Sequence, residues 1–325
     1  MLKRFRPKWQ HGATAVLLTL LVCLPFDWFL PQYTTLMIFI GLSTMVTVGL
    51  CLLMGYTGQV SLGQAAFYGT GAYISAALTK TCGFNPWLAM LLAAAGTGAF
   101  AFLIGYPIFR LKGNYLAMAT LGLGLILYVL FRQLGPGGPS GTGDIDILSI
   151  GSFGFDTPFR RYFLVWGFCL VILVISQNIV NSRTGRALRA IHGSEAAAES
   201  LGINVSQFKV KIFVLSAIYA SLAGSLFVHH LRFVSPQSFD FIASVKLVVM
   251  AVIGGLASVW GAIFGAGTTR LLSDEILLRF GEWDVVIYGL VLMLVMILMP
   301  DGLFVWLKGV FENLRTRLRQ GKVET

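Results

Sequence analysis

The 325-residue chain is 56% hydrophobic, has a mean hydropathy of +0.79 and carries only 12% charged residues. This composition excludes a water-soluble globular protein, because no soluble core needs so many apolar residues, and it indicates a polytopic helical membrane protein. The net charge of +10 is attributed to membrane topology and to contact with anionic lipid, and not to nucleic-acid binding.

Several apolar runs reach the length of about 20 residues that a helix needs to cross the hydrocarbon core. They predict an all-α, polytopic transmembrane helical bundle of about ten membrane elements, eight clear and two short or broken. The clear spans are expected at 13–30, 33–54, 59–79, 86–108, 114–132, 161–180, 209–231 and 284–300. The doubtful pair lies between Phe241 and Leu272 and is separated at Gly254 and Gly255.

The positions of Lys and Arg indicate the orientation of the spans, because basic loops stay in the cytoplasm. Most basic residues fall on one side if ten elements cross, so both termini are expected to be cytoplasmic. The first span is expected to stay uncleaved, since no small-x-small site follows it. The predicted organisation is a basic N-terminus at 1–12, a transmembrane domain at 13–308 and a basic tail at 309–325. This domain includes an external loop at 134–160 and a cytoplasmic polar segment at 181–208.

Polar and glycine residues interrupt two of the predicted helices. Thr57, Gln59, Ser61 and Gln64 place two hydroxyls and two amides within eight residues, which is costly in lipid unless they face a polar path. A true break is therefore expected over 55–64. For Gly69 and for 261–265, close helix packing is the preferred interpretation. The candidates for lining a path are Gln59, Ser61, Gln64, Asn114, Thr120, Gly254 and Gly255.

A polar, alanine-rich segment at 185–202 stands out from the apolar chain. Its pattern predicts two short helices, the first opened by Thr184 or Gly185 and ended by Gly193, the second capped by Ser194 and ended by Gly202. A helix of about two turns is unstable alone in water. The segment must therefore be held by its own membrane domain or by a docked protein. The loop at 134–160 is either a docking surface, a plug over the path or a solvated connection.

The sequence lacks the common motifs for nucleotide binding and metal ligation. It contains no P-loop and no recognisable histidine ligand set, so no nucleotide site, cofactor or metal is expected. His229 and His230, near an outer helix end, are expected at the membrane interface. Lys246 and Arg270 are the candidates for ionisable groups at membrane depth, too few for a typical ion-coupled carrier. A transport path without its own energy source implies an external motor.

Six motifs carry a resemblance to a known family. They are GYTGQVSLGQAAFYGTGAY, LKGNYLAMATLGLG, SRTGRALRAIHGSEAAAESLGINVSQFKVKIFVLSA, AGSL followed by VSPQSF, VIGGLASVWGAIFGA, and PDGLF. From about Met37 to Gly309 the chain resembles the permease subunits of bacterial ABC importers for branched-chain amino acids, the LivM type. Urea and short-amide permeases are near relatives of this family. Two positions depart from the family pattern. The family usually has an acid or a small apolar residue where Lys246 stands, and an arginine is common where His192 stands.

The resemblance implies a transport subunit without catalysis, located in the bacterial inner membrane and forming half of a translocation pathway. The implied partners are a LivH-type second permease subunit, two cytoplasmic ATPases and a periplasmic binding protein. It also implies that a coupling helix lies within 186–202 and contacts an ATPase. The expected coupling residues are Arg186, Arg189, Glu195, Ala196, Ala197, Glu199 and Gly202.

The sequence leaves two alternative functions open. The first is a urea or short-amide permease of the same family. An autonomous channel or secondary carrier is another, and in that case the polar segment would be only a regulatory loop. An intramembrane enzyme is disfavoured, because no Ser/His/Asp constellation or paired intramembrane carboxylates can be identified.

Overall fold

The computed structural model describes residues 31–109, 111, 113–150, 153–273, 289, 290, 293 and 297. The span predicted at 13–30, most of that at 284–300, and both terminal segments lie outside the described residues. The predicted total of about ten membrane elements and the cytoplasmic location of both termini therefore stay predictions.

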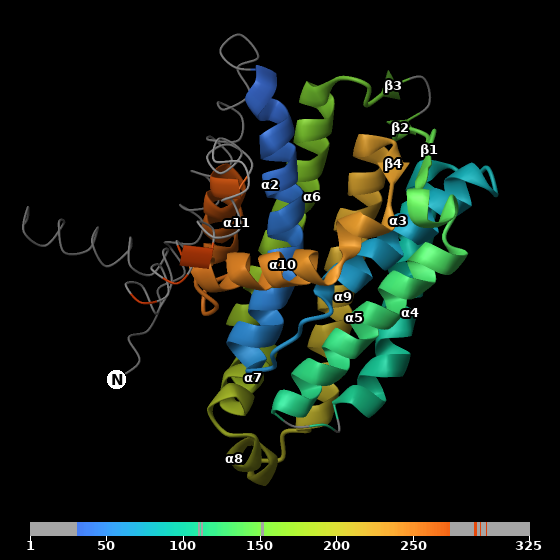
Figure 1. Cartoon of the computed structure of the whole chain (residues 1–325). Helices are drawn as coiled ribbons and strands as arrows, with labels where there is room; N and C mark the ends of the chain where they lie inside the picture. Colours follow the sequence, from blue (N-terminus) through green and yellow to red (C-terminus); the bar gives the residue numbers. More distant parts are fainter. Residues whose placement is uncertain are drawn as a thin grey trace, which may run out of the picture.

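The described chain is a helical bundle with a few very short strands (Figure 1). The helices are α2 (Pro31–Leu50), α3 (Gln64–Lys80), α4 (Pro86–Ile108), α5 (Asn114–Leu134), α6 (Pro158–Asn181), α7 (Arg183–Gly193), α8 (Glu195–Ser200), α9 (Val205–Leu231), α10 (Phe241–Gly254) and α11 (Gly261–Leu271). One π-helical turn, Cys51–Gly55, extends α2, and two 3₁₀ turns occupy Gly138–Ser140 and Pro236–Phe239. Two antiparallel pairs join β1 (Thr142–Gly143) to β4 (Phe233–Val234) and β2 (Ser149–Ile150) to β3 (Phe153–Gly154).

Six segments of the described chain are long and apolar enough to cross a membrane: Tyr33–Gly55, Pro86–Ile108, Asn114–Leu134, Pro158–Asn181, Val205–Leu231 and Pro236–Gly254. The first five match predicted spans to within a few residues. The span predicted at 59–79 is wrong at its start, because α3 begins only at Gln64. The doubtful pair is confirmed as two helices, α10 and α11, which are separated after Gly254.

Side-chain caps fix where several helices begin. Asn85 accepts a hydrogen bond from the Trp87 backbone N–H at the start of α4, and Thr157 does the same for Arg160 at the start of α6. Both helices have proline in their first turn, where no backbone donor is lost. Asp240 caps α10 by accepting from Ala243 N at 2.8 Å. These caps place the helix starts in positions where the sequence supplies a short polar acceptor.

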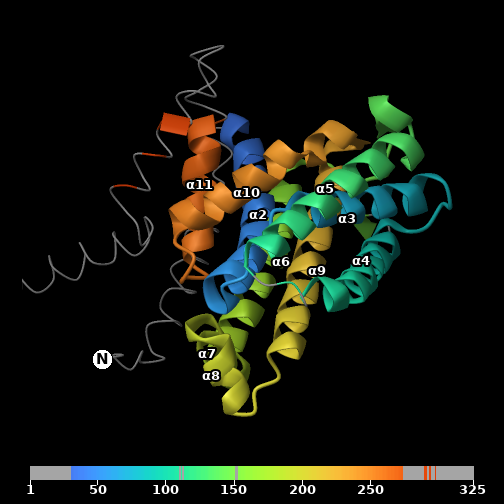
Figure 2. The same ribbon diagram turned by 60° about the horizontal axis from the view of Figure 1, so that its bottom comes forward.

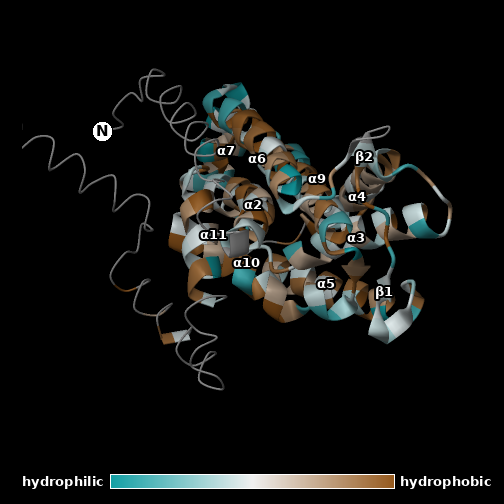
Figure 3. Cartoon of the chain, turned by 90° about the horizontal axis from the view of Figure 1, so that it is seen from above, coloured by the Kyte–Doolittle hydropathy of each residue, from teal (hydrophilic) through white to brown (hydrophobic). Residues whose placement is uncertain are grey.

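Helix α9 is the centre of the bundle. Seen from above, it lies between α6 on one side and α3 and α4 on the other (Figure 3), and it also packs against α2. Small residues let the backbones approach closely. A Cβ at Gly71 would overlap the backbone of Ser221, and one at Gly224 would overlap the carbonyl oxygen of Tyr68. This is the packing mode that small residues provide between membrane helices, where lipid leaves no hydrophobic drive for association.

The glycines assigned to close packing do serve that purpose. A Cβ at Gly69 would lie 2.6 Å from the Phe131 ring, and one at Gly265 would overlap the carbonyl oxygen of Met250 in α10. Helix α10 runs across α2 instead of alongside it, and α11 then packs on both (Figure 1). Gly255, with φ of +99°, makes the sharp turn between them, a conformation that favours glycine.

Large apolar side chains are exposed along α4 and α5. On α5 they are Tyr115, Met118, Leu125, Ile126, Val129, Leu130 and Leu134, and on α4 they are Leu88, Leu91, Leu92, Phe102, Leu103 and Tyr106. Apolar surface of this extent is expected where a helix faces lipid or another membrane subunit.

The close approach of α3 and α9 generates the first prediction. Gly224→Val should lower the stability of the purified chain by about 1–3 kcal/mol, because the added carbons force the two backbones apart. The matched control is Gly167→Val on α6, where a Cβ meets nothing within 4 Å. Thermal unfolding in detergent would measure the difference. Equal unfolding temperatures for the two variants would contradict the packing argument.

Candidate translocation and coupling site

The polar stretch after α2 is a true helix break, as the sequence predicts. The π-helical turn Cys51–Gly55 is followed by one last α-helical turn, and the chain then leaves the helix at Gly58, which has φ of +71°. A π-turn carries one extra residue in the helix and is often found at functional sites. Residues 58–63 have no regular structure, and they are called the first break below.

Side chains from other helices bond to the first break and to the first two residues of α3. Thr120 of α5 accepts from Leu62 N at 3.1 Å, and Ser244 of α10 accepts from Ala65 N at 3.1 Å. Gln64 donates to Ser216 of α9, with the two side chains 2.7 Å apart. These bonds explain how an irregular backbone persists inside an apolar bundle. Sequence reasoning missed Ser216 and Ser244, because a lone serine in an apolar helix carries no signal of its partner.

The first break retains polar atoms without a partner. Ser61 Oγ and Gln64 Oε1 are buried and have no hydrogen-bond partner within the described part of the chain. Buried polar groups are normally paired, so such atoms indicate contact with water or a ligand. A small cavity of about 10 Å³ lies alongside, between Leu62, Gly124 and Asp240. That volume is at the lower limit for one water molecule.

The structure brings four of the seven candidate path residues together. Gln59, Ser61, Gln64 and Thr120 all lie in or against the first break. Asn114 is exposed at the start of α5. The remaining two, Gly254 and Gly255, lie at the turn between α10 and α11. Lys246 is exposed on α10.

The loop between α10 and α11 contacts the region just before the first break. Residues 255–260 form this loop, which is called the second break below. Tyr56 Oη donates to the carbonyl oxygen of Ala257 at 2.9 Å. A Cβ at Gly55 would overlap the carbonyl oxygen of Leu256, so the two backbones touch. The two breaks predicted from the sequence therefore meet in space, although about 200 residues separate them.

The polar segment forms two short helices that project from one end of the bundle (Figure 2). Helix α7 begins at Arg183, with Ser182 as its cap, slightly earlier than predicted, and it ends at Gly193 as predicted. Ser194 caps α8 by accepting from Ala197 N at 3.3 Å, and Gly202 follows α8 with φ of +79°. The predicted cap and the predicted left-handed glycine are both confirmed.

The polar segment is held by its own membrane domain through a small apolar cluster. Ile191 of α7, Ala198 of α8 and Val205 of α9 are buried against one another. Arg189 adds a hydrogen bond to the carbonyl oxygen of Val180 at 3.0 Å, which ties α7 to the end of α6. The membrane domain therefore supplies contacts of its own to both short helices.

The exposed surface of this segment is a mixture of polar, small and apolar groups. Of the predicted coupling residues, Arg186, Arg189, Ala196, Ala197, Glu199 and Gly202 are exposed, whereas Glu195 is partly buried. Leu201, at the end of α8, is 77% exposed. Sequence reasoning did not select Leu201, because a single leucine gives no sign of whether its side chain is buried or exposed. Arg189 is set apart because it bonds to the end of α6, and the other exposed residues, 186, 196, 197, 199, 201 and 202, are called the coupling surface.

Glu195 turns inward and joins three elements. Its Oε1 lies 2.7 Å from Nζ of Lys209 on α9, and Lys209 is only 2% exposed. The same oxygen accepts a bond from Nε2 of Gln59 in the first break at 3.3 Å. Close by, a Cβ at Gly58 would lie 3.1 Å from Nδ1 of His192 on α7. The polar segment thus contacts the first break directly.

The loop between α5 and α6 forms a packed cap at the opposite end of the bundle (Figure 1). Strand β1 in this loop pairs with β4 after α9. Lys80 donates to the carbonyl oxygen of Gly143 at 2.8 Å, and Trp87 donates to that of Ser149 at 2.9 Å. These bonds exclude the interpretation of this loop as a simple solvated connection.

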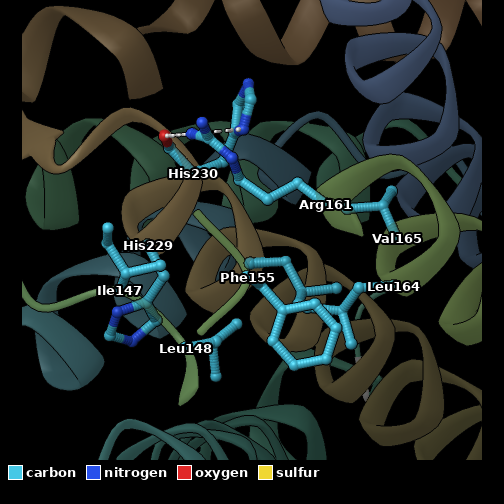
Figure 4. Close-up of a pocket in the computed structure, with 9 residues that line it drawn as sticks. Ile147, Leu148, Phe155, Arg161, Leu164, Val165, His229 and His230 are labelled. Carbon is cyan, nitrogen blue, oxygen red and sulfur yellow. Dashed lines mark hydrogen bonds between the residues drawn. The ribbon is translucent and has the colours of Figure 1, made fainter. Parts of the chain in front are cut away.

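Two histidines and an arginine join the cap to α6 and α9 (Figure 4). His229 is buried and donates from Nδ1 to the carbonyl oxygen of Asp146 at 2.6 Å, while its Nε2 lies 2.8 Å from the Ser75 hydroxyl. Arg161 donates to the carbonyl oxygen of His230 at 2.9 Å. His229 is 1% exposed and therefore faces the protein interior, while the location of the two histidines at the membrane interface stays a prediction. A polar cap folded over the helix end supplies the partners that bury it.

No cluster of three or more His, Cys, Asp or Glu side chains that could hold a metal ion occurs among the residues with a described placement.

Comparisons with known proteins agree with this architecture. Residues 32–298 match the family described as branched-chain amino acid transport system / permease component. The chain is 32% identical over 295 residues to the high-affinity branched-chain amino acid transport system permease protein LivM of Salmonella typhimurium and to that of Escherichia coli. Each alignment covers 83% of this chain and 68% of the relative.

More distant relatives share shorter or weaker similarity. The LivH permease protein of Escherichia coli is 26% identical over 288 residues, which cover 80% of this chain and 90% of LivH. The ribose import permease protein RbsC of Escherichia coli is 32% identical over 162 residues, about half of each chain. No solved structure matches the chain. With its apolar helices and its match to the family over most of its length, this multi-pass membrane protein belongs to the family of branched-chain amino acid transport system permease components.

Proposed function

We propose that the chain is the LivM-type permease subunit of a bacterial ABC importer for branched-chain amino acids, located in the inner membrane. The similarity to two LivM proteins over 83% of the chain carries this proposal. As a permease subunit, the chain supplies a path and a coupling surface, and its partners supply the nucleotide chemistry and the substrate capture.

The two helix breaks are proposed to form this subunit's half of the path. Ser61 and Gln64 present unpaired polar atoms there, and Thr120 and Ser244 support the backbone from α5 and α10. Polar groups at such a break can replace part of the hydration of an amino acid's charged groups, whereas the apolar walls accept its side chain.

The second half of the path is proposed to come from a LivH-type partner. Helix α5 flanks the first break and exposes apolar side chains over its whole length, including Met118, Ile126 and Val129. A partner subunit on α5 would bury these side chains and lie next to the break. The similarity of this chain to LivH supports a pair of related subunits.

The coupling surface is proposed to dock on one of two cytoplasmic ATPases. It projects beyond the bundle on two short helices, and Leu201 offers an apolar side chain at the tip. Docking there would place the cytoplasm at this end, so the cap between α5 and α6 would face the periplasmic binding protein. The charge pattern of the sequence favours the same orientation.

Leu201→Glu should prevent docking. A leucine buried at an interface contributes at least about 1.5 kcal/mol, so its replacement by a carboxylate should weaken ATPase binding about tenfold or more. The measurement is co-purification of the ATPases with the chain and its LivH-type partner in detergent. Leu201→Met is the matched control, because it preserves an apolar side chain of similar volume.

The Leu201 variant is preferable to changes at Glu195 or Gly202. Glu195→Arg would place a second cation beside the buried Lys209, and Gly202 has a positive φ that disfavours other residues. Either change would disturb folding as well as docking. ATPases that bind the Leu201→Glu chain as strongly as the wild type would exclude this tip from the interface.

Proteoliposomes with the full complex and its binding protein should take up labelled leucine only when ATP is supplied on the side of the membrane that carries the ATPases. Isoleucine and valine should compete with leucine, and ribose and urea should not. Competition by urea would favour the short-amide alternative. Uptake by this chain alone without ATP would contradict the proposal and favour an autonomous channel or carrier.

A further inference from the structure

Lys209 is an unusual residue in this molecule. It is the one Lys, Arg, Asp or Glu side chain classed as buried among the described residues, with 2% exposure. A buried ammonium group is costly unless it is paired, and removal of its partner leaves that cost uncompensated. Glu195 is that partner, at 2.7 Å. The pair joins α8 of the polar segment to α9, the central helix.

The carboxylate of Glu195 also forms a hydrogen bond with a residue of the first break. Oε1 accepts from Nε2 of Gln59, and that amide donates in addition to the carbonyl oxygen of Thr57 at 3.2 Å. Gln59 is 7% exposed, so the amide side of these bonds is buried, whereas the carboxylate of Glu195 keeps partial access to water. One amide thus bridges the end of the broken helix and the start of α8.

The chain just before the first break contacts the second break. The hydroxyl of Tyr56, three residues before Gln59, donates to Ala257, and Gly55 touches Leu256. No other helix intervenes between α8 and the first break or between Tyr56 and the second break at these contacts. A displacement of α8 therefore has a short route to both breaks.

We infer that Gln59, Glu195 and Lys209 form a tether that transmits movement of the coupling surface to the two helix breaks. In this arrangement Glu195 is a positioning residue and not an ATPase contact, and Gln59 acts on the path through its bond to Glu195. The inference rests on the proposed function, because it requires an ATPase that moves the coupling surface.

The test uses two variants that cut the tether in different places. Gln59→Leu has a similar volume and removes both amide bonds while the Glu195–Lys209 pair remains. Lys209→Met keeps the length of the side chain and removes its charge, and the released Glu195 can be hydrated because it is 35% exposed. Lys211→Met is the matched control, since Lys211 lies on the same helix but is exposed.

The measurement is leucine uptake and ATP hydrolysis in proteoliposomes that contain the full complex. Both tether variants should retain bound ATPases and ATP hydrolysis, but leucine transported per ATP should fall about fivefold or more, the smallest change typical of coupled sites. The double variant should be no worse than Lys209→Met alone, because both changes cut one connection. Lys211→Met should match the wild type.

Other results would overturn the tether. In Gln59→Leu, an unchanged ratio of leucine transported to ATP hydrolysed would do so. If the leucine concentration for half-maximal uptake also changed at that unchanged ratio, Gln59 would be a path residue instead. If Lys209→Met fails to fold, Gln59→Leu decides alone, because it leaves the ion pair intact. If the ATPases bind the wild type and drive uptake, and both tether variants transport as much leucine per ATP as the wild type, the tether fails and the proposed function stands. If the ATPases do not bind the wild-type chain, both fail.

Discussion

The constraint on which this structure depends is that backbone polar groups inside an apolar bundle must find partners within the protein. Thr120 of α5 meets it for Leu62 N in the first break, and Ser244 of α10 meets it for Ala65 N in the first turn of α3, while Ser216 of α9 holds the side chain of Gln64 between them. Each bond requires its helix at a fixed distance and rotation. The irregular stretch is therefore stable only because α5, α9 and α10 surround it, and its geometry in turn fixes where those helices lie.

Close packing of small residues makes this enclosure possible. Gly71 and Gly224 bring α3 and α9 into backbone contact, and Gly265 does the same for α10 and α11. At the first break itself, a Cβ at Gly63 would overlap the carbonyl oxygen of Thr120, so the approach of α5 that brings the Thr120 hydroxyl to Leu62 N also requires a glycine.

The two ends of the bundle are built differently. At one end, the cap between α5 and α6 is tied to α9 by strand pairing and by the buried ring of His229. At the other, α7 and α8 rest on a cluster of three buried side chains and on the ion pair of Glu195 with Lys209. A small apolar cluster with a polar tether can shift as a unit more easily than a hydrogen-bonded cap. This contrast fits a polar segment that moves and a cap that stays in place.

The sequence by itself determined the class of protein, most helix limits, the two breaks and the caps of the polar segment. These features follow from local chemistry: apolar run length, glycine at a positive φ, and short polar residues at helix starts. The motifs also led to the family. By contrast, the start of α3, the burial of His229 and the exposure of Leu201 depended on neighbours from distant parts of the chain.

Only the tertiary structure decided that the second break touches Gly55 and Tyr56, just before the first break, and that Glu195 bonds to Lys209 and Gln59. From the sequence, Glu195 was grouped with residues that face a partner, and Gln59 with residues that face the path. Their joint role depends on a contact between positions 136 residues apart. No local pattern encodes such a contact, because it exists only when α9 and the broken end of α2 are packed side by side.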